Sequence, residues 1–303
     1  MNLSLFGQLA IAMSACAAQK PAQDTFAGWI RSSSCSVLLQ NPARKKAIPL
    51  NSAQTTAFKL YAGQSVRAVG SGVVKLLIYG HEHLLTPENG WYPIPKSKDQ
   101  APKGQDIYVK FTSRAGMPRG EKANPESIWR AFSLTDLVNP NPHSPVKIHG
   151  SIHLESGQRV ATSKTSTVKT GAHFWFEAEN DSNIPVFVSI VDIDCAAGVD
   201  VIPSKSNGGP IRLAPHSGWI RCGELMTADL PTGFKTGIER FRFIATTHPV
   251  DLFSLASKSA PDPRVEFEPT KDPLANLIKM CSGSDPKGLT DWGLDPVDVT
   301  FKR

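Results

Sequence analysis

The sequence contains no apolar run of the roughly 18 residues that a membrane-spanning helix requires, which excludes an integral membrane protein built from helices. With 23 glycines and 24 prolines among 303 residues, it stays well below the roughly 25–30% that marks low-complexity chains. It also shows no internal repeat. The 40% of apolar residues can form packed cores, and the length predicts about two globular domains.

Concentrated basic charge is also absent. The chain has 33 Lys and Arg against 27 Asp and Glu, a net charge of +6. The one tight basic run, residues 44–46, lies between Pro42 and Pro49 and is typical of a solvated turn. No recognisable module or face of interleaved aromatic and basic residues predicts nucleic-acid binding. We interpret the charge as a solubility feature.

Phosphate-binding and cofactor motifs are missing too. Gly70 and Gly72 flank Ser71, but neither a helix nor the lysine of a phosphate-binding loop follows them. The sequence therefore predicts no cofactor.

The first 18 residues have the length and apolar character of a secretory signal peptide. Residues 15–17 fit an A-x-A cleavage site, and residues 13–16 resemble a lipobox that would make Cys16 a lipidation site. This predicts a periplasmic, envelope-associated or extracellular protein with a candidate lipid anchor. The segment lacks Lys and Arg, so an N-terminal helix packed on a cytoplasmic protein is the alternative.

Four cysteines remain when Cys16 is set aside: Cys35, Cys195, Cys222 and Cys281. An even number is compatible with two disulfides. Cys195 and Cys222 end or lie in apolar strand segments of the same half, so they are the predicted pair. Cys281 continues the apolar stripe of a short helix, which favours a free buried thiol.

Hydrophobic periodicity predicts a mainly β fold with two β-sandwich or small-barrel domains, each with one short helix. The predicted helices cover residues 124–132 and 273–281; Asn124 and Asp272 are their predicted N-caps, and Gly283 ends the second. A hairpin is predicted from strands 72–79 and 83–85, with its turn at residues 80–82. Further strands are predicted at 91–95, 106–111, 173–179, 185–193, 239–245 and 297–301.

Three prolines between residues 139 and 145 separate the two strand-rich halves and predict a linker or a stiff connection. We therefore predict a signal peptide at 1–18, an N-terminal β domain at 30–138, a linker at 139–145 and a C-terminal β-sandwich domain at 146–303.

Short turns and strands of the second half resemble a known domain over about residues 145–303. The matching stretches are residues 180–188, 201–203, 213–218, 230–233, 238–247 and 291–292, the last of them before 299–301. The pattern resembles the β-rich domain of unknown function that is appended to the C-terminal side of caspase-like (metacaspase-type) peptidases in bacteria and fungi. No segment alternates strands and helices as the α/β peptidase domain would. The resemblance therefore implies an accessory module that presents a substrate or binds a partner.

Two histidines form the pattern that best fits a metal site. His81 and His83 are two residues apart, so on a strand they point to one side, and His149 or His153 would be a third metal ligand. The alternative is that His81 and His83 are exposed residues of a hairpin tip, because no carboxylate or cysteine lies nearby at regular ligand spacing.

Two other patterns are weaker. Asp192 and Asp194 would raise the pKa of Cys195, which favours a structural cysteine over a nucleophile. Asp192, Asp194 and Asp200 could hold Ca²⁺, but they lack EF-hand spacing and are typical of a solvated strand end.

The sequence therefore predicts a non-catalytic, exported or envelope-associated protein that binds another protein or a surface polymer. One form of this prediction is an accessory module of a caspase-like peptidase system. The alternative prediction is a metal-dependent hydrolase that uses His81, His83 and His153.

Overall fold

The computed structural model describes residues 26–42, 46–55, 58–79, 81–100, 105–106, 125–161, 166–204, 208–256 and 270–303. The fold is mainly β, as predicted, and the strands of these described residues form four sheets. The predicted signal peptide, Cys16 and Asn124 lie outside the described residues.

Two sheets come from the first half of the chain. Sheet A has the order β4-β1-β6-β7-β9 and sheet B the order β3-β2-β5-β8. The strands of sheet A are Phe58–Tyr61, Phe26–Ser33, Val74–Ile78, His81–Leu85 and Gln105–Asp106, and those of sheet B are Ile48–Leu50, Ser36–Gln40, Ser65–Val69 and Tyr92–Pro93.

The other two sheets come from the second half. Sheet C has the order β11-β10-β13-β17, and sheet D the order β12-β19-β18-β14-β15, with β16 beside β14. The strands of sheet C are Arg159–Ala161, Ile148–Leu154, His173–Asn180 and Ser217–Thr227. Those of sheet D are Ser166–Lys169, Trp292–Lys302, Thr236–Thr246, Val186–Ile193 and Val199–Ile202, with β16 at Ile211–Leu213. β12 and β19 pair in parallel, whereas β19 pairs with β18 in antiparallel orientation.

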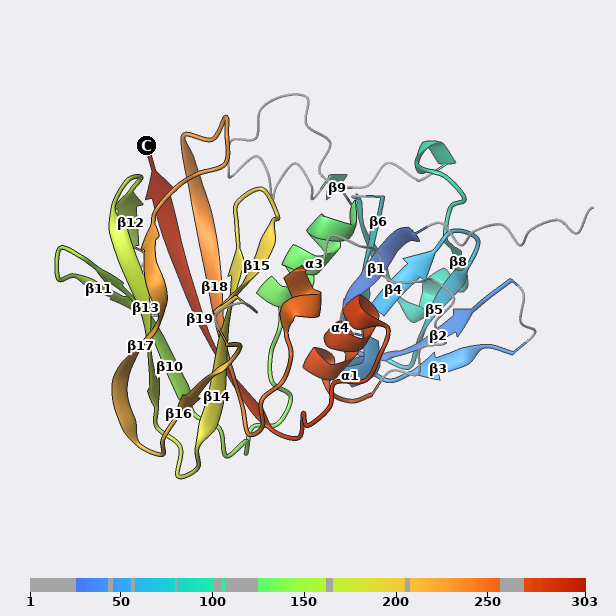
Figure 1. The fold of residues 1–303 in the computed structure, drawn as a ribbon. Helices are drawn as coiled ribbons and strands as arrows, with labels where there is room; N and C mark the ends of the chain where they lie inside the picture. Colours follow the sequence, from blue (N-terminus) through green and yellow to red (C-terminus); the bar gives the residue numbers. More distant parts are fainter. Residues whose placement is uncertain are drawn as a thin grey trace, which may run out of the picture.

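The sheets and helices form successive layers, visible from left to right in Figure 1 as sheet C, sheet D, the helices, sheet A and sheet B. The helices are α1 (Ser52–Thr55), α3 (Pro125–Thr135) and α4 (Pro273–Ser282), and short 3₁₀ turns occur at Pro87–Asn89, Lys98–Gln100 and Phe253–Ala256. Sheets C and D pack face to face as a sandwich. Side chains alternate in direction along a strand, so Phe174, Phe176 and Ala178 of β13 all point into the core between the two sheets. Sheets A and B enclose a second core.

A third apolar cluster joins the two halves. It contains Trp29 of β1, Trp129 of α3, Ile193 of β14, Ile244 of β18 and Leu277 of α4. The helices therefore fill the space between sheets A and D and bury residues of both.

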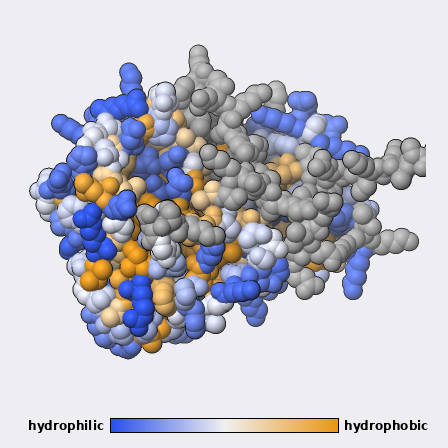
Figure 2. All heavy atoms as spheres, in the orientation of Figure 1, coloured by the Kyte–Doolittle hydropathy of each residue, from blue (hydrophilic) through white to orange (hydrophobic). Residues whose placement is uncertain are grey.

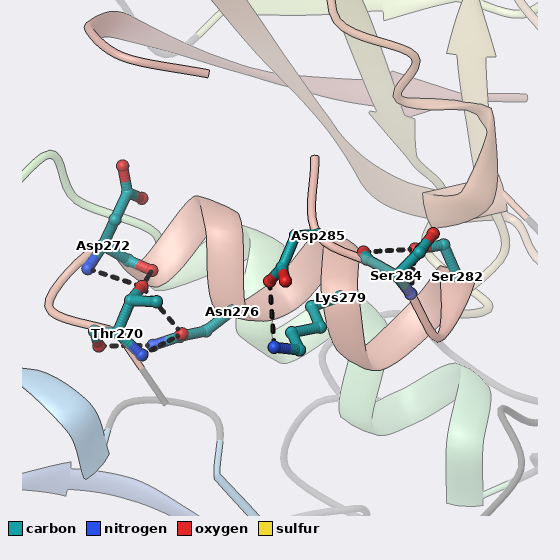
Figure 3. A network of polar contacts seen from close by, with 7 residues as sticks. All are labelled: Thr270, Asp272, Asn276, Lys279, Ser282, Ser284 and Asp285. Carbon is teal, nitrogen blue, oxygen red and sulfur yellow. Dashed lines mark hydrogen bonds and ion pairs between the residues drawn. The ribbon is translucent and has the colours of Figure 1, made fainter. Parts of the chain in front are cut away.

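The residues around α4 explain why this helix begins and ends where it does. Asp272 Oδ1 accepts hydrogen bonds from the amides of Leu274 and Ala275, and Gly283 ends the helix in the left-handed conformation with φ of 75°. Figure 3 shows the surrounding contacts, among them the ion pair of Lys279 with Asp285 at 2.9 Å. The predicted cap and stop of this helix are confirmed.

The Pro-rich connection between the halves is held against β19. The Asn139 side-chain amide and the Ser144 hydroxyl both donate hydrogen bonds to the carbonyl oxygen of Trp292. The domain boundary at residues 139–145 stays a prediction, but this segment is fixed at both of these points.

Candidate functional site

The outward face of sheet C carries the most distinctive group of side chains among the described residues. Because successive residues of a strand alternate in direction, the inward Phe174 and Phe176 leave Trp175 and Glu177 pointing away from sheet D. The neighbouring strands place His153 opposite Trp175, and Arg221 opposite Glu177. We call the following group the Trp–Arg surface: His153, Arg159, Trp175, Glu177, Trp219 and Arg221.

Glu177 is the centre of this surface. Its Oε1 accepts hydrogen bonds from Trp175 Nε1 and His153 Nδ1, both at 3.1 Å, and its Oε2 accepts one from Arg159 Nη2 at 2.6 Å. Burial by itself raises the pKa of Glu177, but the hydrogen bonds from Trp175 and Arg159 and the charges of Arg159 and His153 outweigh it. The pKa of Glu177 is therefore below its ordinary value, and the carboxylate is ionised at neutral pH.

Stacking contacts fix the aromatic rings. The His153 ring stacks on Trp175 with centroids 4.5 Å apart, and the Arg221 guanidinium lies 5.2 Å from the Trp175 ring centroid. Arg159 lies 4.5 Å from the ring centroid of Trp219. Cation–π contacts of this kind hold long arginine side chains in place.

Arg221 differs from Arg159 in having no polar partner among the described residues. Glu177 lies directly across from it, but both Glu177 oxygens already accept hydrogen bonds from other groups. Arg221 is exposed, so its guanidinium N–H groups are available to a ligand. The surface thus combines a positioned cation with half-buried aromatic rings.

A hydrolytic role for this face is not supported by its geometry. Ser151, His153 and Glu177 lie close in register and resemble the members of an acyl-transfer triad. However, Ser151 is completely buried, and its hydroxyl has no hydrogen-bond partner, so His153 does not activate it. The arrangement can bind a ligand, but it presents no accessible nucleophile.

Replacing Glu177 by glutamine is expected to lower the free energy of unfolding at pH 7 by about 1–2 kcal/mol. Glutamine has one acceptor oxygen where glutamate has two, so the three donors of His153, Arg159 and Trp175 can no longer all be paired. Since the folded-state pKa lies below the unfolded one, the contribution of Glu177 is present above about pH 4.3 and is lost as the pH falls through the folded-state pKa. Urea unfolding at pH 7 and pH 3 measures this. Glu155→Gln, at an exposed position, is the control; an equal loss in both variants at pH 7 contradicts the role of Glu177.

The predicted metal ligands do not come together as a set. His81 and His83 both lie in β7, whereas His153 lies in sheet C and is hydrogen-bonded to Glu177. His149 is an exposed residue of β10. Among the described residues, no three or more His, Cys, Asp or Glu side chains form a group suited to a metal ion. The described residues therefore do not bring His81 and His83 together with His149 or His153.

The hairpin that carries His81 is confirmed, but its turn is displaced from the predicted position. Strand β6 ends at Ile78 and pairs with His81, so the chain turns from Tyr79, which has a φ of 47°. His81 and Glu82 consequently belong to the strand rather than to an exposed tip. Burial, with a smaller effect of the neighbouring His81, lowers the pKa of His83.

The predicted disulfide is wrong. Cys195 and Cys222 are both free thiols in the core between sheets C and D, as are the buried Cys35 and Cys281 elsewhere. Cys222 lies on β17 and donates to the Ile220 carbonyl oxygen, whereas Cys195 follows β14 of the opposite sheet, next to Glu239. Burial raises the pKa of both Cys195 and Cys222 to about 12, so neither is a reactive thiolate.

The acidic residues near the end of β14 differ in exposure: Asp192 and Asp194 are half-buried, whereas Asp200 of β15 is exposed, as expected for a strand end. Asp192 Oδ1 is inaccessible and has no hydrogen-bond partner, and Glu239 of β18 is 4% exposed. Burial and the charges of Asp194 and Asp200 raise the pKa of Asp192 to about 7. Burial and the charges of Asp192 and Asp194 raise the pKa of Glu239 to about 8. Sequence reasoning missed Glu239, because it comes from a strand 47 positions after Asp192.

One described pocket lies beside the Pro-rich connection. Its volume is about 160 Å³, and its lining includes Asn139, Asn141, Asp272 and Trp292. Most of these side chains already hydrogen-bond to one another or to the backbone. Ligand sites generally measure about 300–1,000 Å³, so this pocket is too small for most organic ligands.

The view in Figure 2 shows hydrophilic and hydrophobic residues interspersed over the C-terminal half on this side. In the part of the chain that the structure describes, no helix is both long enough and apolar enough to cross a membrane. No protein-family model matches the chain, and no curated protein is significantly similar to it.

Proposed function

We propose that this chain is a non-catalytic binding protein whose Trp–Arg surface holds a protein partner through its acidic side chains. The observation that carries the proposal is Arg221, which stacks on Trp175, is exposed and lacks a carboxylate partner among the described residues. A guanidinium over an aromatic ring can still present N–H groups, which match the two oxygens of a carboxylate.

The composition of the surface supports binding. Tryptophan and arginine dominate the energetics of protein interfaces, because they combine large contact areas with directional donors. Glu177 holds Trp175 and Arg159 in place before a ligand arrives, which reduces the entropy lost on binding.

The proposed setting is the cell envelope or the exterior, with a caspase-like peptidase system as one context. The signal-like first residues and the resemblance of residues 145–303 support this setting, whereas the free cysteines lend it no support. Cell fractionation with N-terminal mass determination tests it. A cytoplasmic protein that retains Met1 would contradict export and would leave the binding surface to be tested separately.

Arg221→Gln is expected to weaken the binding of a glutamate-rich peptide by about tenfold or more, because it removes the unpaired cation. Arg221→Lys keeps the charge but loses the planar donors, so an intermediate loss is expected. Affinities measured by isothermal titration at low and high salt provide the readout.

The matched control is Arg212→Gln, at an exposed arginine of β16 in the opposite sheet. Equal losses in Arg212→Gln and Arg221→Gln would indicate nonspecific charge attraction and overturn the proposal. So would the absence of peptide binding by the wild-type protein, or tighter binding to a carboxylated polysaccharide such as polygalacturonate.

A further inference from the structure

Three buried polar atoms without hydrogen-bond partners lie on the facing strands β7 and β8. They are Nδ1 of His81, Nε2 of His83 and the hydroxyl of Tyr92. Native structures leave very few buried polar atoms unpaired, and each such atom calls for an explanation. Three of them on neighbouring side chains point to a bound species that the polypeptide itself does not supply.

The strand geometry brings these side chains to one place. His81 and His83 are two residues apart in β7, so they point to the same side as Leu85, which is buried in the core between sheets A and B. Leu84, which points the other way, is 61% exposed. Tyr92 comes from β8 of sheet B, and its ring centroid lies 5.5 Å from that of His83.

We infer that His81 and His83 bind a divalent transition-metal ion through these two ring nitrogens, with the Tyr92 hydroxyl hydrogen-bonded to a water molecule on the ion. Imidazole nitrogen is a preferred ligand of zinc, copper and nickel. The polypeptide supplies two ligands and water completes the coordination, so the ion is exchangeable. A hydroxyl that orients a metal-bound water is a common outer-shell contact.

This site is separate from the proposed binding surface. It lies between sheets A and B in the first half of the chain, whereas the Trp–Arg surface lies on sheet C in the second half. The inference therefore holds or fails independently of the proposed function.

The test is a calorimetric zinc titration of the full chain after removal of metal with a chelator, which measures the stoichiometry and the affinity at equilibrium. We expect one zinc ion per chain. His81→Gln and His83→Gln are each expected to weaken zinc binding by about 100-fold, and Tyr92→Phe by about tenfold. His149→Gln, at an exposed histidine of β10, is the matched control and is expected to bind zinc as the wild type does.

A wild-type chain that binds no zinc would overturn the inference and would indicate that an ordinary water molecule fills the site. Equal losses in His149→Gln and His83→Gln would also overturn it, because surface histidines would then account for binding. If the β7 variants fail to fold, ring-nitrogen NMR of the wild type decides. Zinc must then shift the resonances of His81 and His83 and leave those of His149 in place.

Discussion

Replacing Asp192 by asparagine is expected to raise the free energy of unfolding at pH 8 by about 2–4 kcal/mol. The carboxyl group is buried at the end of β14, its Oδ1 has no partner, and the charges of Asp194 and Asp200 act on it. Burial and these charges raise its pKa to about 7, so at pH 8 the folded protein carries a costly buried anion. Asparagine has nearly the same shape and no charge.

The direction of the pH dependence follows from the two states. The folded-state pKa of Asp192 exceeds the value near 3.9 of an unfolded chain, so the folded protein binds the proton more tightly. The contribution of Asp192 to the free energy of unfolding is fully present below about pH 3.9 and is lost as the pH rises through about 7. Glu239, with a pKa of about 8, acts in the same direction. Wild-type stability is therefore expected to fall between pH 5 and pH 8.5.

Urea unfolding at pH 5 and pH 8.5 measures the effect. Asp192→Asn should remove the part of the decline that Asp192 causes and leave the part that Glu239 causes, whereas Asp181→Asn, at an exposed position, should leave the whole decline unchanged. An identical decline in wild type and Asp192→Asn would show that other groups cause it.

Trp129→Ala is expected to lower the free energy of unfolding by about 3–5 kcal/mol, the usual cost of truncating a large buried aromatic residue. Trp129 is fully buried in α3, and Lys59 Nζ lies 4.1 Å from its ring centroid. It belongs to the apolar cluster that also includes Trp29 of sheet A and Ile244 of sheet D. The cavity would therefore open between the two halves of the chain.

Because both halves share this cluster, we expect the wild type and Trp129→Ala each to unfold in one transition. Circular dichroism and tryptophan fluorescence along a urea gradient should give the same midpoint. Val138→Ala, at a residue that is 69% exposed, is the control and should change stability little. Separate midpoints for the two probes would contradict a shared core and favour the independent domains predicted from the sequence.

Local patterns were sufficient to predict several elements. Alternation over residues 173–179 predicted β13 and its inward Phe174, Phe176 and Ala178, and the structure confirms them. The cap Asp272 and the stop Gly283 predicted α4 within one residue. These features depend on neighbours in sequence, so the sequence carries enough information to place them.

The sites depend on strands that are distant in sequence, and they could not be predicted in the same way. Trp175 and Glu177 are the outward residues of a correctly predicted strand, but Arg221 reaches them only through the pairing of β13 with β17. A positive φ at Tyr79 is rare for an aromatic residue, so local sequence patterns favour a later turn with His81 at its tip.

The position of β19 in sheet D has a consequence for synthesis of the protein. This strand lies between β12, which ends at Lys169, and β18, yet it begins only at Trp292. Until the ribosome has released residues 292–302, β12 lacks its neighbour and β18 has an open edge. Unpaired strand edges of this kind can pair with other chains, so the last strand of the sequence is the one that closes sheet D against such pairing.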